Sequence, residues 1–349
     1  MKLSASTHEQ LTQWRRHLHA HPELGFEERT TSDFVAERLT EMGIAVTRNI
    51  GGTGLVGTLS AGTGNRSIGL RADMDALAIQ EIPGRDHGSQ NPGKMHACGH
   101  DGHTTMLLGA AQHLVAHPEF SGTVHFIFQP AEEHGRGALS MIEDGLFERF
   151  PMEEIYGIHN MPGIPVGQFA TRPGPFMGAE DNFEIVVTGK GVHAARPHSG
   201  VDPIVAASAI VMGLQTIVSR RIDPTRPCVV SVTEFIINGT RNVIPSEVRI
   251  KGDCRSFLPE VSAAIETEMR RLADSIAAGY AASATVAYSR EFVPTINAAE
   301  TTEASVRVAR RVLGEDAVDA DCPLRMGSED FAHMLARVPG TFVNLGNGA

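Results

Sequence analysis

The sequence predicts an α/β protein: a mixed, largely parallel sheet flanked by helices, with an inserted ferredoxin-like α+β domain. Three observations support this prediction. Short apolar strands alternate with amphipathic helices over residues 1–179, as in βαβ units. Between residues 180 and 292 the order becomes strand, helix, two strands, helix, strand, which is that of a ferredoxin-like unit. Helical and strand-like segments resume after residue 293.

The first part contains strands and helices in alternation. Leu11–Ala20 and Thr31–Met42 have the apolar spacing of amphipathic helices and are separated by a turn. A loop rich in Gly, Pro and Asn, Pro83–Gly93, precedes a third helix, Thr104–Val115. The expected strands are Leu55–Leu59, Ser67–Leu70, Thr123–Phe128 and Ile155–Ile158, and Gly137–Asp144 is expected to be helical.

The inserted part and the return to the first domain follow. In the insertion we expect strands Phe183–Val187, Val229–Ile236, Val248–Cys254 and Ala284–Tyr288, and helices Pro203–Val218 and Ser262–Ala278. After it we expect helices Ala304–Leu313 and Asp330–Leu335 and a closing strand Thr341–Leu345. The predicted domains are therefore 1–179 with 293–349, and 180–292.

Composition limits the classes of function. The chain has 349 residues, enough for two domains, and 41 acidic against 30 basic residues give a formal net charge of −11. This charge disfavours nucleic acid or an anionic membrane as the main partner. We expect neither a signal peptide nor a transmembrane helix, because no suitable apolar segment is present. The four cysteines form no CxxC pair, which argues against a disulfide scaffold and favours a reducing cytoplasm.

The densest group of potential metal ligands spans His96 to His103. Cys98 and His100 are two residues apart in a loop before a helix, and the glycine between them permits tight geometry, so both side chains can reach one ion. The alternative is a buried free Cys beside a helix-capping His. Because more imidazoles and a carboxylate surround the pair, we favour metal binding, with His96, Asp101 and His103 as supports.

Carboxylates and a further imidazole follow three of the expected strands. One residue of the Glu132-Glu133 pair could bind metal while the other accepts a proton from water, although a solvated acidic turn is the alternative. Strand alternation would send only one of Asp73 and Asp75 toward the site, and we favour Asp75. His159 follows another strand. Since ligands bind at the carboxyl ends of strands in open α/β sheets, these residues should meet at one edge.

Two other histidine groups are weaker candidates. His17, His19 and His21 do not share a helix face at a spacing of two, so we do not expect them to bind metal. His193, within Gly191–His198 of the insertion, could reach a substrate, with a surface loop histidine as the alternative.

Together these segments resemble the metal-dependent aminoacylase, or N-acyl-amino-acid amidohydrolase, family, which includes hippurate hydrolases and hydrolases of indoleacetyl-amino-acid conjugates. The resemblance runs nearly end to end, and the order and spacing of its motifs make it specific. The motifs are Arg15–His19 with Pro22-Glu23, Arg71–Leu77, Met95–His103, Gln129–Glu133, Tyr156–Asn160, Gly191–Pro203, Asn242–Pro245 and Gly327–Phe331.

The resemblance implies a zinc-peptidase-like catalytic domain with two divalent metal ions. The residues that match the family's ligands are Cys98, His100, Glu133 and His159. Such a set of donors admits manganese, zinc, cobalt or nickel. Glu132 matches the general base, and Asp75 matches the acid that orients a ligand in related peptidases.

The resemblance also implies that the insertion is a dimerisation or lid domain, so we expect a homodimer or higher oligomer. His193 would reach the substrate or its oxyanion, in one arrangement within the partner subunit's site. Asn242 and Arg255 would bind the substrate's amide oxygen or carboxylate. The family has a further metal-binding His near its C-terminus. His333 matches it poorly because it lies within an expected helix, so we expect that ligand beyond Ala349.

The predicted reaction is hydrolysis of the amide bond of N-acyl amino acids, giving a carboxylic acid and a free amino acid. A dipeptidase or carboxypeptidase on the same scaffold is the alternative within enzymes. A metal-binding protein without turnover is the alternative outside them, and the Glu132-Glu133 pair argues against it. A zinc nucleobase deaminase is not expected, because no PCxxC follows an HxE.

Overall fold

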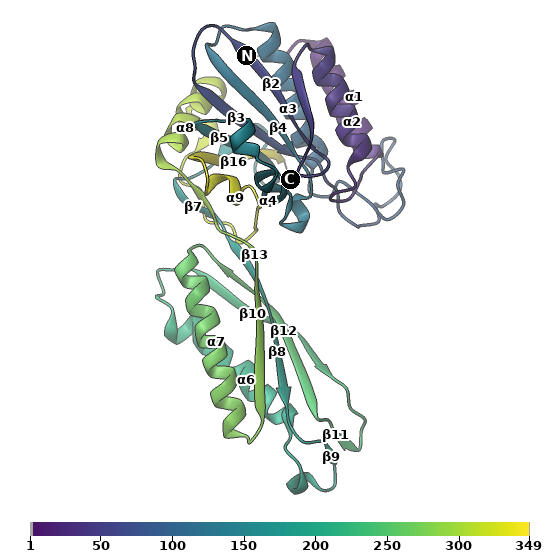
Figure 1. Cartoon of the computed structure of the whole chain (residues 1–349), viewed down its shortest axis with the longest axis vertical. Coiled ribbons are helices and arrows are strands. Elements are labelled where there is room, and N and C mark those ends of the chain that lie inside the picture. The colour runs from purple at the N-terminus through teal and green to yellow at the C-terminus, as the bar shows by residue number, and fades with distance from the viewer. Residues whose placement is uncertain (1–2, 349) are drawn as a thin grey trace. The chain divides into compact units, whose positions relative to one another are not determined.

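The computed structural model describes residues 3–348, which form two compact units (Figure 1). The first unit contains the described residues up to Phe176, then Ile296–Pro323, and those from Asp330 onward. The second contains Met177–Thr295 and Leu324–Glu329. The sequence did not indicate that Leu324–Glu329 joins the second unit. It does so because Gly178 N donates hydrogen bonds to the carbonyl oxygens of Arg325 and Gly327.

The first unit is built on an eight-stranded sheet with the strand order β1-β2-β4-β3-β5-β16-β6-β15. The four central strands, β4, β3, β5 and β16, pair in parallel, and antiparallel pairs join β1 to β2, β2 to β4 and β16 to β6. The predicted mixed, largely parallel sheet is confirmed. The strands are β1 (Ala45–Ile50), β2 (Gly54–Ala61), β3 (Ser67–Asp73), β4 (Gly122–Gln129), β5 (Glu154–Pro162), β6 (Phe169–Ala170), β15 (Val318–Asp319) and β16 (Gly340–Gly348).

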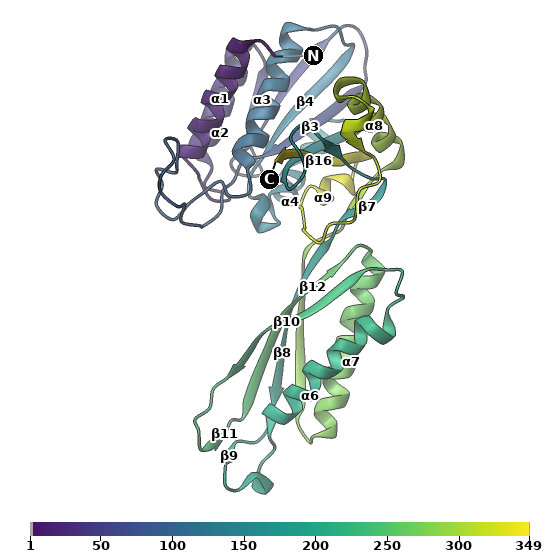
Figure 2. The same ribbon diagram turned by 180° about the vertical axis from the view of Figure 1, so that it is seen from behind.

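Three helices, α1 (Ala5–Ala20), α2 (Arg29–Glu41) and α3 (His100–Ala116), lie side by side in the first unit (Figure 2). Trp14 of α1, Leu39 of α2 and Leu108 of α3 share a buried core with apolar residues of β2, β3 and β4. The apolar residues at helical spacing in the sequence thus form the face that each helix buries. The remaining helices are α4 (Gly137–Glu143), α5 (Leu146–Arg149), α8 (Ala299–Leu313) and α9 (Ala332–Leu335).

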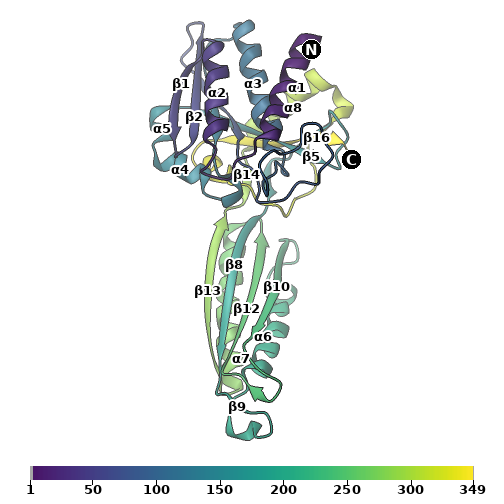
Figure 3. The ribbon, with the colours of Figure 1, turned by 90° about the vertical axis from the view of Figure 1, so that its right-hand side faces the viewer.

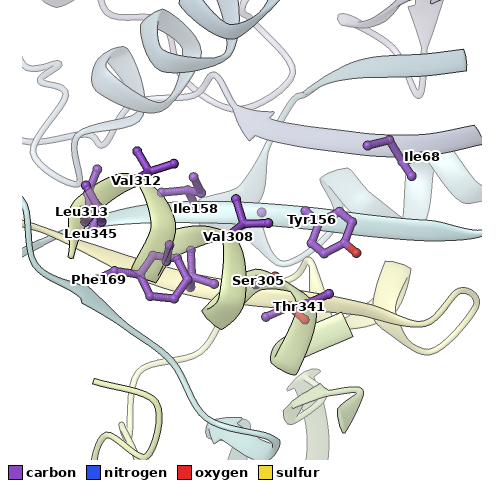
Figure 4. A pocket seen from close by; sticks show the side chains of 14 residues that line it. Ile68, Tyr156, Ile158, Phe169, Ser305, Val308, Val312, Leu313, Thr341 and Leu345 are labelled. Carbon is purple, nitrogen blue, oxygen red and sulfur yellow. The ribbon is translucent and has the colours of Figure 1, made fainter. Parts of the chain in front are cut away.

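An apolar pocket of about 500 Å³ lies between α8 and the sheet (Figure 4). Tyr156 and Ile158 of β5 line it, together with Val308 and Val312 of α8. Side chains alternate between the two faces of a strand, so His159 points to the opposite face of β5 from this pocket. The pocket is therefore separate from the predicted metal ligands.

The second unit has the order β8, α6, β10, β12, α7, β13, and its sheet has the strand order β10-β12-β8-β13 (Figure 3). This is the ferredoxin-like arrangement that the sequence predicts. Ile185 of β8 and Ile250 of β12 pack against Ile210 of α6 and Ile265 of α7. The elements are β8 (Ala179–Thr188), β9 (Val192–His193), α6 (Pro203–Thr216), β10 (Cys228–Ile237), β11 (Val243–Ile244), β12 (Glu247–Ser256), α7 (Pro259–Gly279) and β13 (Ser283–Phe292).

One helical segment, Pro203–Arg221, is long and apolar enough to cross a membrane by length and composition. No such segment was expected from the sequence. Ile210, Leu214 and Ile217 are fully buried in the core of the second unit, which accounts for part of the segment's apolar composition, whereas Val205 and Met212 are exposed.

Candidate metal centre

The carboxyl ends of β3, β4 and β5 bring the predicted site residues of the first unit together. Asp73 at the end of β3 pairs in register with Gln129 at the end of β4, and β3 also pairs with β5. Glu132 and Glu133 follow β4 in a short 3₁₀ turn, η1 (Glu132–His134). His159 lies within β5 rather than after it, because this strand continues to Pro162.

Helix α3 begins at His100, four residues earlier than predicted, so His100 lies in its first turn and Cys98 lies just before it. Gly99 has φ +91°, a left-handed conformation that favours glycine. A Cβ at this position would lie 2.3 Å from Asn160 Nδ2 on β5. The glycine between the two predicted ligands is therefore favoured both by backbone conformation and by close contact with β5.

Four donor atoms meet at this edge. Cys98 Sγ lies 3.4 Å from His159 Nε2, and His100 Nε2 lies 3.8 Å from Glu133 Oε1. Two ligands bound tetrahedrally to one ion at about 2.0–2.3 Å are separated by about 3.5 Å, so both pairs are spaced as ligands are. These donors belong to two overlapping groups that could hold an ion, Cys98–His100–His159 and His100–Glu132–Glu133, and His100 also belongs to a third group with Asp73 and His103.

Hydrogen bonds orient both histidine rings with Nε2 toward the site. Nδ1 of His159 donates to the Asn160 carbonyl, and Nδ1 of His100 donates to Asp75 Oδ1 at 3.1 Å. Within residues 3–348, neither His100 Nε2 nor Glu133 Oε1 has a hydrogen-bond partner, although both are buried. A buried polar atom without a hydrogen-bond partner is costly unless an ion binds it, so these residues fit a metal.

The electrostatics of the ligands differ from one to the next. Burial lowers the pKa of His159 to about 3, so its ring is neutral at pH 7. Burial opposes charge on His100 as well, but Asp73 and Asp75 raise its pKa well above the usual value. Burial raises the pKa of the Cys98 thiol and of Glu133. A divalent ion bound by these predicted ligands would therefore compete with protons on His100 and Cys98.

Asp73 was expected to point away from the site, because strand alternation would send only one of Asp73 and Asp75 toward it. It is fully buried and accepts hydrogen bonds from His103 Nδ1 at 2.6 Å and from Arg71 Nη1 at 2.7 Å. His103 Nε2 accepts the Asn160 N–H at 2.9 Å, so both ring nitrogens are engaged. These two hydrogen bonds fit the supporting role expected for His103, although its ring also lies in a possible metal-binding group with Asp73 and His100. Both aspartates reach the site because β3 ends at Asp73 and strand alternation stops there.

The supporting residues of α3 form a second buried network. Asp101 accepts hydrogen bonds from His19 Nδ1 at 2.9 Å and Arg15 Nη1 at 3.1 Å, and His19 also contacts Glu81. His96 is buried, and neither ring nitrogen has a hydrogen-bond partner within residues 3–348. His17 stacks on Phe34 and His21 Nδ1 bonds to the His17 carbonyl, which places these rings away from the metal donors.

Glu132, the predicted base, is buried beside the metal donors. Its Oε1 accepts the backbone N–H of Asp330 at 3.4 Å, and its Oε2 lies 4.0 Å from His100 Nε2. Asp330 is itself fixed by Arg71 Nη2 and by Gln129 Nε2 at 2.7 Å. The sequence showed Asp330 only as part of a motif, because no local pattern links it to Glu132.

The predicted substrate-binding residues all lie in the second unit, in two places. His193 of β9 pairs with Val243 of β11, and the carbonyl oxygen of Asn242 accepts the N–H of Ala194. Both side chains are exposed.

Arg255 lies at the other end of β12, paired with Glu180 at 2.8 Å and Asp253 at 2.9 Å. The two places lie toward opposite ends of β12. Eight residues of this strand, at about 3.3 Å each, correspond to a separation of about 26 Å. Within one chain these three residues therefore do not form a single site.

The fold and these donors define the class: an α/β metal-dependent hydrolase with its site at the carboxyl ends of the central strands. Residues 69–349 match the model of Peptidase family M20/M25/M40, and the chain belongs to this family.

The relatives confirm the resemblance seen in the sequence. The chain is 41% identical to IAA-amino acid hydrolase ILR1-like 4 of Arabidopsis thaliana, over 95% of this chain and 76% of the relative. It is 40% identical to hippurate hydrolase of Campylobacter jejuni, over 91% of this chain and 82% of the relative. The crystal structure of the Bacillus subtilis YXEP protein, a dinuclear metal binding peptidase from the M20 family, has a TM-score of 0.86 at 35% identity. The structural match covers 98% of this chain and 90% of the Bacillus subtilis chain.

Proposed function

We propose that this protein hydrolyses the amide bond of N-acyl amino acids, with two divalent metal ions bound by Cys98, His100, Glu133 and His159. The observation that carries this proposal is the convergence of these donors beside the buried Glu132. Relatives named for hydrolysis of hippurate and of IAA–amino acid conjugates, at 40% and 41% identity, support this substrate class. A solved relative at 35% identity that binds two metals supports the number of ions.

The chemistry follows from the position of each group. Bound divalent ions polarise an amide carbonyl and make water more acidic. Glu132 removes the proton from the attacking water and returns it to the leaving nitrogen, so the products are a carboxylic acid and a free amine. Asp75 holds the His100 ring through its Nδ1.

An assay of turnover tests this function directly. Benzoylglycine and a free dipeptide would be compared with manganese, zinc, cobalt and nickel, and we expect the N-acyl amino acid to be the better substrate. Glu132→Gln should keep its metal content but lose about 10²–10⁴ in kcat. Glu143→Gln, an exposed glutamate on α4, is the matched control. A metal-loaded Glu132→Gln protein with the wild-type rate contradicts the assignment of the base, and preference for the dipeptide favours the peptidase alternative.

The second unit is proposed to form a homodimer in which His193 and Asn242 serve the partner's site. β10 is an edge strand, and its Phe235, Ile236 and Ile237 are 38–41% exposed, which is suited to pairing with a second copy. Arg255 is already paired with two carboxylates, so we assign substrate contact to His193 and Asn242 ahead of it.

Mixing two inactive variants tests the exchange of residues. In a heterodimer of Glu132→Gln and His193→Ala, one site keeps both Glu132 and the partner's His193. Random reassociation should then restore about a quarter of the wild-type activity. No recovery, with heterodimers confirmed by sedimentation and mass spectrometry, would place His193 in its own subunit's site.

We also propose a reducing, cytoplasmic location, supported by the four free cysteines Cys98, Cys228, Cys254 and Cys322.

A further inference from the structure

The turn that carries Glu132 and Glu133 contacts a buried carboxylate from a distant part of the chain. Glu28 lies at the N-cap position of α2 and is 0% exposed. Its Oε1 accepts the backbone N–H of Ala131 at 2.8 Å, and its Oε2 accepts the hydroxyl of Thr53. Glu28 thus contacts the residue that directly precedes the predicted base.

Ala131 needs such a partner because of its backbone conformation. It has φ +48° and ψ +43°, a left-handed conformation that residues with a Cβ rarely adopt. The direction of the chain through Glu132 and Glu133 depends on these two angles. The Ala131 N–H donates a hydrogen bond to the buried Glu28 carboxylate, and this contact holds the conformation in place.

The residues just before Glu28 pack against the same turn. A Cβ at Gly25 would lie 2.6 Å from His134 Nδ1 and 3.0 Å from Ala131 Cα. Phe26 also has a positive φ, +64°, and its ring centroid lies 6.3 Å from that of His134. Residues 25–28 therefore pack against residues 131–134. Each segment includes a residue other than glycine that has a positive φ.

Other contacts hold the turn beyond Ala131. Asp75 Oδ2 accepts the Glu133 N–H at 3.0 Å, and the Ala131 carbonyl accepts the Gly137 N–H at 3.1 Å. Glu28 is the side chain that holds the start of the turn, and Asp75 holds its end. Loss of the first contact would let Ala131 relax and would move both carboxylates away from His100.

We propose that Glu28 is a positioning residue of the metal centre, which aims Glu132 and Glu133 by fixing the left-handed conformation of Ala131. The inference rests on the proposed function for its kinetic readout only, since metal affinity is measured without turnover.

Three variants of Glu28 test the proposal. Glu28→Ala removes the acceptor, and Glu28→Asp keeps the charge but shortens the side chain by one methylene. Both should weaken Co²⁺ binding about 10–100-fold and lower kcat more than they change KM. Glu28→Gln keeps an acceptor oxygen for the Ala131 N–H and should stay within about threefold of wild type in both quantities.

Glu23→Ala is the matched control. Glu23 accepts hydrogen bonds from the N–H groups of Thr30 and Thr31 and from the Thr31 hydroxyl, at the start of the same helix. The Glu23→Ala substitution should lower the melting temperature but leave Co²⁺ affinity and kcat unchanged. This control separates an effect on stability from an effect on the position of the ligands.

The outcomes separate this proposal from the proposed function. A folded Glu28→Ala or Glu28→Asp protein with wild-type Co²⁺ affinity overturns it, as does Glu28→Gln with the defect of Glu28→Ala. If Glu28→Ala does not fold, Glu28→Asp against Glu28→Gln still decides. If the wild type binds Co²⁺ but cleaves no N-acyl amino acid, the proposed function fails, while the order of affinities in the Glu28 series still supports or overturns the positioning role.

Discussion

Asp75 Oδ1 lies 3.1 Å from His100 Nδ1, between two buried side chains. The other carboxylate oxygen accepts the Glu133 N–H at 3.0 Å. One aspartate therefore sets the tautomer of one proposed ligand and the backbone of another. Because the outer partners of metal ligands orient them, this residue should affect metal binding without touching the metal.

Two substitutions of Asp75 should weaken metal binding to different degrees. Asp75→Asn keeps one acceptor oxygen for two N–H donors, so we expect a loss of about 10-fold in Co²⁺ affinity. Asp75→Ala leaves both donors without a partner and should cost about 100-fold. Equilibrium dialysis with Co²⁺ measures both, and Asp86→Ala, in an exposed loop, is the control. An Asp75→Ala protein that binds Co²⁺ like the wild type would remove Asp75 from the centre.

Metal affinity should increase with pH. Burial opposes charge on His100, but Asp73 and Asp75 raise its pKa well above the usual value, and burial raises the pKa of Cys98. Both shifts favour the protonated form, and a divalent ion competes with that proton at each group. We therefore expect log K for Co²⁺ to rise by about two per pH unit near neutrality.

Calorimetry in buffers of different ionisation enthalpy counts the protons released. Cys98→Ser should lower the slope by about one, because the serine hydroxyl does not ionise in this range, whereas Cys228→Ser in the second unit should not change it. A slope near zero for the wild type would mean that neither His100 nor Cys98 gives up a proton.

The parts of the site that could be predicted from the sequence lie at strand ends. Apolar strands marked the positions of Glu132, Glu133 and His159, and parallel pairing of those strands brings them together. Cys98 and His100 were visible because ligand types were close in the chain. The end of β3 could not be predicted, so only one of Asp73 and Asp75 was expected to reach the site, whereas both lie beside His100.

Other contacts depend on tertiary packing and have no local sequence signal. Glu28 lies 103 residues before Ala131, and a glutamate at a helix start is ordinary in sequence terms. The left-handed conformation of Ala131 was equally hidden, since alanine does not favour it. The distance between Arg255 and His193 depends on the full length of β12. The sequence motifs identified both residues but did not show how far apart they lie.

Gly99→Ala should disrupt the metal centre by steric contact. A Cβ would lie 2.3 Å from Asn160 Nδ2, and φ is +91°, so the segment carrying Cys98 and His100 must shift. We expect a loss of at least about 10-fold in Co²⁺ affinity. Gly93→Ala is a matched control, because Gly93 has φ +75° but no atom within 4 Å of its added Cβ. Equal effects of the two variants would show that backbone strain, and not the contact with Asn160, accounts for the loss.

Glu28 should also make stability depend on pH. Burial raises its pKa from 4.5 to about 7, so the folded state holds the proton more tightly than the unfolded state. The resulting stabilisation is fully present below pH 4.5 and is lost as the pH rises through 7, by roughly 3 kcal/mol in total. Glu28→Gln is neutral throughout, so the unfolding free energy of the wild type minus that of the variant should fall over this interval and level off above it. Urea unfolding of both proteins with chelator present, since metal binding stabilises the folded state, gives this difference. A difference that stays constant from pH 4.5 to 8 would show that the Glu28 carboxyl has the same pKa in both states.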